Sequence, residues 1–167
     1  MIEVDRGRAM GDAERGSLDR GVYLAQLLVP FLMPWIFFVG RLWLGAPSGW
    51  LSGPGLLLIG PPMAIALGIP VIVSLRDRGA YSRRRGERGY TVASLVTWAA
   101  LLAGALTVTD AGAPRMPTSV LGVWTGGAVS EVASQYLFFI CVVAAVVAWA
   151  TALVLAIRGV FVAHRNA

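Results

Sequence analysis

RDRGAYSRRRGER, residues 76–88, separates two long apolar runs that contain no charged residue. The first run begins at Leu42 and the second ends at Thr109. A short arginine-rich segment between stretches of this length is typical of the loop between two transmembrane helices. The segment therefore predicts a helical integral membrane protein.

The composition of the whole chain agrees with a membrane domain. Of its 167 residues, 57% are hydrophobic and only 14% are charged, and the mean hydropathy is +0.71. A soluble domain is nearer half apolar, with about a quarter of its residues charged. We therefore expect one membrane domain and no separate soluble domain.

Four apolar stretches are long enough to cross a bilayer as helices. A helix rises about 1.5 Å per residue and the hydrocarbon core is about 30 Å thick, so about 20 residues suffice. The stretches lie at about 21–41, 55–75, 89–109 and 134–157. Glycine and proline are frequent at residues 45–55, so a turn is expected there, and the first two spans should form a hairpin. The expected fold is an all-α, polytopic membrane protein with four transmembrane helices.

The regions outside the spans are short. Residues 1–20 should form a polar, disordered cytoplasmic tail, and residues 159–167 a second, shorter one. Between them lies a single transmembrane domain at 21–158. An arginine-rich cytoplasmic loop at 76–88 and a longer outer loop at 110–133 connect its spans.

The N-terminal stretch is unlike a signal peptide. It mixes five acidic residues with four arginines, and the apolar run that follows is too long for the core of a signal sequence. We therefore expect no cleaved leader. Met10 is an alternative start of translation.

Arginine is distributed unevenly between the two sides of the expected spans. With the N-terminus inside, the tail contributes four arginines, the 76–88 loop six and the C-terminal segment two, whereas the opposite side has only Arg41 and Arg115. Short loops rich in arginine stay on the cytoplasmic side of a membrane. Both termini are therefore expected to be cytoplasmic. Arg41, next to the outer boundary, is expected to extend its guanidinium toward the headgroups.

Every basic residue is arginine, and lysine is absent. A GC-rich genome explains this bias, so the expected location is the cytoplasmic membrane of a bacterium with such a genome. The formal charge of +5 would also suit nucleic acid, but the arginines lie beside spans, so anionic lipid headgroups at the inner face are the expected partner and nucleic acid is not. A specific acidic partner in the cytoplasm is the alternative. The residues expected to make these contacts are Arg76, Arg78, Arg83, Arg84, Arg85 and Arg88.

Aromatic residues mark the expected boundaries of the spans. Tyr23 and Tyr90 lie at the inner ends of the first and third spans. Rings with a polar edge favour the headgroup level of a bilayer. The same argument assigns four residues to the outer boundary, namely Trp43, Trp50, Trp124 and Tyr136. Three deeper tryptophans are expected to be packing residues, namely Trp35, Trp98 and Trp149.

Small residues indicate where the spans pack against each other. In lipid, helices associate where small side chains allow their backbones to approach closely. We expect the third and fourth spans to pack along two stripes of small residues, Ala144, Ala148, Ala152 and Ala156 on one and Ala100 and Gly104 on the other. Chance spacing in an alanine-rich sequence is the alternative.

Prolines interrupt the first two spans, at Pro30 and Pro34 in the first and at Pro61, Pro62 and Pro70 in the second. Proline removes a helix donor and clashes with the preceding turn, so both spans should be kinked. Broken helices can line transport sites, although they also occur without that role. No Asp, Glu, Lys or His lies within a span, so proton-coupled transport through a buried carboxylate is not expected.

The sequence contains no recognisable catalytic, cofactor-binding or metal-binding motif. His164 is the only histidine and Cys141 the only cysteine, so neither a haem held by paired histidines nor a dithiol centre is expected. Zinc-protease and serine-hydrolase patterns are absent. An enzyme would instead need a polar cavity where Asp110, Arg115 and Glu131 converge.

The sequence alone does not name a reaction. The preferred interpretation is a non-enzymatic accessory or scaffold subunit that packs against other membrane proteins or against itself. The alternative is a small transporter or channel component for a neutral or weakly polar solute, with the kinked spans lining its path. A membrane enzyme is the third possibility.

Overall fold

The computed structural model describes residues 20–76, 88–110 and 118–165, with side chains as far as Val162. Every regular element in these ranges is a helix. After a first helical segment at 20–25, the elements are α2 (Val29–Trp35), the π-helix η1 (Ile36–Gly40), α3 (Arg41–Trp43), the π-helix η2 (Leu51–Gly55), α4 (Leu56–Leu75), α6 (Arg88–Thr107), α7 (Val120–Trp124) and α8 (Glu131–Arg165).

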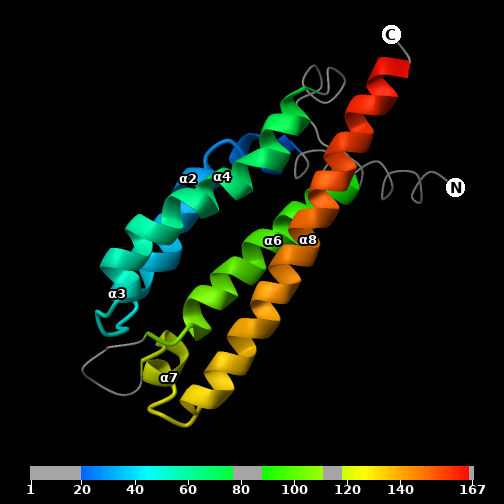
Figure 1. Cartoon of the computed structure of the whole chain (residues 1–167). Helices are drawn as coiled ribbons and strands as arrows, with labels where there is room; N and C mark the ends of the chain where they lie inside the picture. Colours follow the sequence, from blue (N-terminus) through cyan, green and yellow to red (C-terminus); the bar gives the residue numbers. More distant parts are fainter. Residues whose placement is uncertain (1–19, 77–87, 111–117, 166–167) are drawn as a thin grey trace, which may run out of the picture.

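The helices form two antiparallel pairs that lie side by side (Figure 1). One pair joins α2 to α4, and the other joins α6 to α8 in the most extensive contact among the described elements. α4 also packs against α8, which connects the two pairs. At one end lie α3, α7 and the first residue of α8, and we call this the α7 end. The end of α4, the start of α6 and the end of α8 lie at the opposite end, which we call the C-terminal end.

Within the described ranges, three helices are long and apolar enough to cross a bilayer, which indicates a membrane protein. They cover Leu51–Leu75, Arg88–Thr107 and Glu131–Val162. Their outward faces carry bulky apolar side chains, such as Leu57 on α4 and Val143 on α8, which are 77% and 62% exposed. Side chains of this kind are compatible with hydrocarbon and not with water.

The first expected span is shorter and interrupted. Its continuous apolar part is Val29–Trp43, and a turn at residues 26–28 separates it from the segment at 20–25. Pro30 explains the interruption, because it lacks the N–H that would bond to the carbonyl of Gln26 four residues earlier. The kink predicted for this span is therefore a local break in the helix.

Pro70, in the second half of α4, leaves a backbone carbonyl without its helical donor, and a residue of α8 bonds to that carbonyl. Pro70 cannot donate to the carbonyl of Ala66, and the indole Nε1 of Trp149 donates to that oxygen instead, at 2.8 Å. A carbonyl left free in hydrocarbon is costly, so this bond compensates for the donor that Pro70 removes from α4. Trp149, expected to be a packing residue, thus also makes a hydrogen bond that joins α4 to α8.

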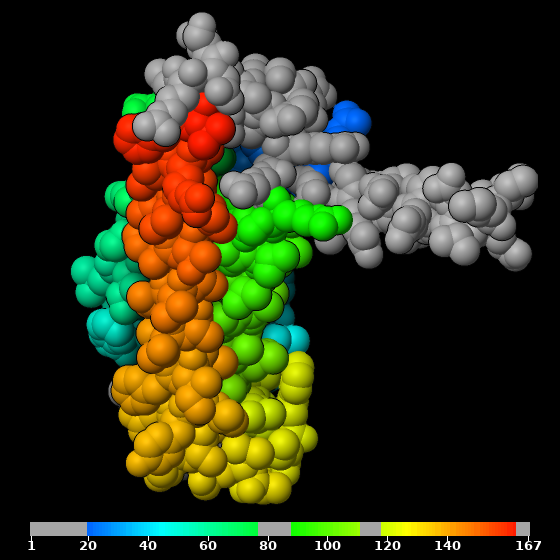
Figure 2. Space-filling view, turned by 90° about the vertical axis from the view of Figure 1, so that its right-hand side faces the viewer, coloured from blue at the N-terminus to red at the C-terminus, as the bar shows by residue number. Residues whose placement is uncertain are grey.

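Small residues line the seam between α6 and α8, which Figure 2 shows lying along each other. Ala152 and Ala156 form a buried cluster with Tyr90 and Ala93 of α6. A Cβ on Gly104 would make an ordinary contact with Cys141 of α8 at 3.6 Å, so the two helices lie close together at this position. Among the other residues of the two expected stripes, Ala148 is buried, and Ala100 and Ala144 are half-buried.

Candidate functional site

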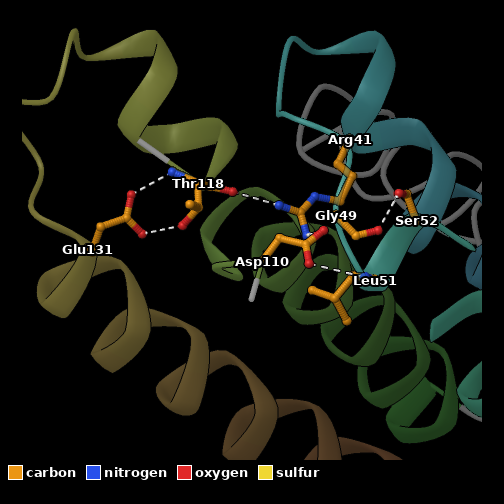
Figure 3. A network of polar contacts seen from close by, with 7 residues as sticks. All are labelled: Arg41, Gly49, Leu51, Ser52, Asp110, Thr118 and Glu131. Carbon is orange, nitrogen blue, oxygen red and sulfur yellow. Dashed lines mark hydrogen bonds and ion pairs between the residues drawn. The ribbon is translucent and has the colours of Figure 1, made fainter. Parts of the chain in front are cut away.

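Four residues that are far apart in the sequence meet at the α7 end of the bundle (Figure 3). Arg41 is the first residue of α3, and Asp110 follows the end of α6. Thr118 precedes α7, and Glu131 is the first residue of α8. We call these four residues the Arg41 network.

Arg41 is buried at the centre of this network, with a side chain only 1% exposed. Its Nη2 donates to the backbone carbonyl of Thr118 at 2.7 Å, and its Nη1 lies 3.6 Å from Oδ2 of Asp110. The expectation that Arg41 extends toward the headgroups is therefore wrong. The carbonyl of Thr118 and the carboxylate of Asp110, both inside the fold, hold the guanidinium instead.

Asp110 connects the end of α6 to the chain between the first two apolar segments. Its Oδ1 accepts a hydrogen bond from the backbone N–H of Leu51 at 3.1 Å, at the start of η2. Gly49 allows this approach, because a Cβ at this position would lie only 2.5 Å from the carboxyl carbon of Asp110. The glycine in this turn is therefore a steric requirement of the site.

Glu131 fixes the other side of the network. Its two carboxylate oxygens accept hydrogen bonds from the Thr118 backbone N–H at 2.6 Å and from the Thr118 hydroxyl at 2.5 Å. A carboxylate in the first turn of α8 also interacts favourably with the helix dipole. Next to it, Ser119 caps α7 by accepting from the Gly122 N–H and lies 3.1 Å from the Ser134 hydroxyl of α8.

The network joins α3, α6, α7 and α8, and its charged side chains contact other groups of the protein. Arg41 holds α3 to Asp110, which follows α6, and to Thr118, which precedes α7. Glu131 holds Thr118 to the start of α8. The Nη1 of Arg41 and the Oδ2 of Asp110 form an ion pair at 3.6 Å, which is longer than a hydrogen bond. These two atoms and the Nε of Arg41 form no hydrogen bond within the described structure. The arrangement suits a clamp on the connections at this end.

Two of the three residues considered for an enzyme, Asp110 and Glu131, are used in contacts within the fold. Asp110 and Glu131 lie on opposite sides of Thr118, and each is bonded to protein groups (Figure 3). Arg115 lies outside the described residues. Among the residues that the structure describes, no group of three or more His, Cys, Asp or Glu side chains could hold a metal ion.

A second polar cluster lies in the half of the bundle toward the C-terminal end. The Gln26 amide donates to the Ser74 hydroxyl at 3.3 Å, and the Tyr90 hydroxyl donates to the Gln26 oxygen. Tyr23 and Tyr90 are both 4% exposed, so their rings are buried between helices at the end where a headgroup position was expected. The adjoining cavity of about 20 Å³ is lined in part by Gln26, Ser94 and Thr97, and it has room for about one water molecule.

The arginines expected to contact lipid or a partner are only partly described. Arg76 follows the end of α4 and Arg88 begins α6, and both are exposed at the C-terminal end. Arg78, Arg83, Arg84 and Arg85 lie outside the described residues, as do residues 1–19 of the expected N-terminal tail.

Sequence reasoning missed the pairing of Arg41 with Asp110. One signal was available, because these two residues of opposite charge border apolar segments on the same side of the expected membrane. Gly49 carried no comparable signal, since a glycine in a turn is common.

Comparison of the chain with protein-family models, with curated proteins and with solved structures gives no match.

Proposed function

We propose that the chain crosses the membrane four times, with both termini on the cytoplasmic side. The helical stretch from Arg20 to Trp43, although interrupted, would extend about 36 Å at a helical rise, which exceeds a hydrocarbon core of about 30 Å. The exposed Arg76, Arg88 and Arg158 belong to the C-terminal end of the bundle, whereas the α7 end contains the buried Arg41. An excess of exposed arginine on one side supports a cytoplasmic C-terminal end.

Thiol labelling tests this topology. In a chain with Cys141→Ala, we expect a membrane-impermeant thiol reagent added to intact cells to label Ser48→Cys, which lies at the α7 end between the first two apolar segments. The same reagent should label Arg83→Cys only after the membrane is opened. Labelling of Arg83→Cys in intact cells, or protection of Ser48→Cys in them, would contradict the proposed orientation.

We further propose that the protein is a non-enzymatic accessory or scaffold subunit that packs against other membrane helices. The observation that carries this proposal is the division of its surface. The charged groups at the α7 end bond to one another and to the backbone, while α4 and α8 present rows of bulky apolar side chains outward. Such a chain offers neighbouring proteins a preformed helical face.

Purification after mild solubilisation tests the scaffold proposal. The wild-type protein is expected to elute with one or more membrane proteins in fixed proportion. Two variants change the two exposed faces separately, Val143→Phe with Val147→Phe on α8 and Leu57→Phe with Ile65→Phe on α4. One of them should lower the yield of the partner while the other leaves it unchanged, so each is the control for the other. Elution of the wild type without a partner, or equal partner yield from all three proteins, would refute the proposal.

One observation favours transport as a second candidate function. The turn at residues 26–28 lies beside the small cavity that is lined in part by Gln26, Ser94 and Thr97, and Pro70 of α4 also lines it. Unwound segments next to polar side chains form solute sites in transporters. Flux of a small neutral solute into liposomes that contain only this protein, above the flux into protein-free liposomes, would support transport over scaffolding.

A further inference from the structure

A large apolar groove lies between the first apolar segment and α6, at the α7 end of the bundle. Its volume is about 820 Å³. One wall follows the face of residues 32–44 through Leu32, Ile36 and Gly40, and the other is formed by Leu102 and Leu106 of α6. Three tryptophans complete the lining, namely Trp35, Trp43 and Trp124, and they remain 60%, 87% and 58% exposed.

The chemistry of the groove selects a hydrocarbon occupant. Nearly every lining residue is aliphatic or aromatic. Arg41 is the one charged residue in the lining, and its side chain is only 1% exposed and lies against Thr118 and Asp110 inside the fold (Figure 3). A ligand with a polar group at this depth would find no exposed charged partner, and such a group is costly in hydrocarbon.

We propose that this groove binds an acyl chain of a membrane phospholipid from the leaflet at the α7 end. Residues 32–44 would span roughly 18 Å at a helical rise, which is close to the thickness of one leaflet, about half of a 30 Å core. The indoles of Trp43 and Trp124 lie at the end of the groove where the headgroup would be, and tryptophan favours that level of a bilayer. Trp124 is held there because its Nε1 donates to the Leu44 carbonyl at 3.0 Å.

The walls of the groove are irregular. Large side chains such as Leu32, Trp35 and Leu106 line it together with the smaller Gly40 and Ala105. A flexible acyl chain can follow such a surface and contact it along its length.

The proposal does not depend on the scaffold function, because the rows of apolar residues offered there to partner helices lie on α4 and α8. The lining of the groove comes instead from the first apolar segment, α6 and α7. If no partner protein is captured, the proposed lipid site is therefore not contradicted. If no lipid is retained, the scaffold proposal is not contradicted.

A matched pair of glycine substitutions tests the site. Gly40 lines the groove, and a Cβ there would meet only the Ile36 side chain at 3.6 Å, so Gly40→Leu fills the groove without a backbone clash. Gly68→Leu adds the same side chain to α4, where a Cβ would meet nothing within 4 Å. Native mass spectrometry of protein purified in mild detergent and washed of loosely bound lipid measures the retained phospholipid.

Wild type and Gly68→Leu are expected to retain one phospholipid, and Gly40→Leu to retain it about tenfold less, with the melting temperature compared for all three proteins. Val39→Phe, which fills the same groove, replaces Gly40→Leu in the comparison if that variant does not fold. Equal retention by wild type and the groove variant would overturn the proposal. Wild type without bound phospholipid would also overturn it, as would an isoprenoid lipid, a second copy of the chain or another protein in the groove.

Discussion

Replacing Arg41 with methionine is expected to lower the free energy of unfolding by about 3–5 kcal/mol, because Asp110 would be left buried without its partner. The two side chains are 1% and 0% exposed, so water cannot take the place of the lost guanidinium. Thr118 would also lose the donor to its carbonyl. Unfolding in mixed detergent micelles, followed by circular dichroism, measures the change.

A double-mutant cycle separates the ion pair from the rest of the network. Asp110→Asn keeps the Oδ1 acceptor for the Leu51 N–H but removes the negative charge. Arg41→Met combined with Asp110→Asn should be less destabilised than the sum of the two single variants, since no unpaired charge remains buried. Arg158→Met removes an exposed arginine from α8 and is the control, with an expected change within about 0.5 kcal/mol. Additive single effects would show that the pair does not stabilise the fold as a unit.

Replacing Ala152 with leucine should separate α6 from α8 locally and destabilise the fold by about 1–3 kcal/mol. Ala152 is 3% exposed and packs against Tyr90 and Ala93, so three extra carbon atoms have no space between the helices. Displacement of Tyr90 would also disturb its hydrogen bond to Gln26. The same unfolding assay measures this loss.

The control for this variant is two residues away on the same helix. Ala150 is exposed, so Ala150→Leu adds an identical side chain to the outer face of α8 and should leave the free energy of unfolding nearly unchanged. If both leucine variants unfolded alike, or if neither differed from wild type, the tight packing of this seam would be refuted.

Several parts of the fold could be predicted because their causes are local in the chain. An apolar stretch of sufficient length partitions into hydrocarbon by the sum of its own residues, so the long helices and the all-α class follow from the sequence. The prolines of the first span predicted a kink by the same local logic. The prolines alone did not specify the form of that disruption, which is a turn at residues 26–28 between two helical segments.

The candidate site was less predictable, because it depends on how the ends of separate helices meet. Arg41 and Thr118 are 77 positions apart, and Arg41 taken alone is best placed at the headgroups. The hydrogen bond from Trp149 to the Ala66 carbonyl, which Pro70 leaves without a helical donor, could not be predicted either. Nothing in the sequence pairs Trp149 with this part of α4. Gly49 is required only because Asp110 from another segment occupies the space beside it.

For this protein, the sequence by itself determined the apolar helices and the arginine-rich segment between them, since transfer of a segment into lipid depends on its own length and composition. Only the tertiary structure decided that Arg41 is buried with Asp110, that Trp149 bonds to α4 and that an apolar groove opens beside α6. These features depend on distances between helices. Such distances are set by the packing of all the side chains together and by no single stretch of sequence.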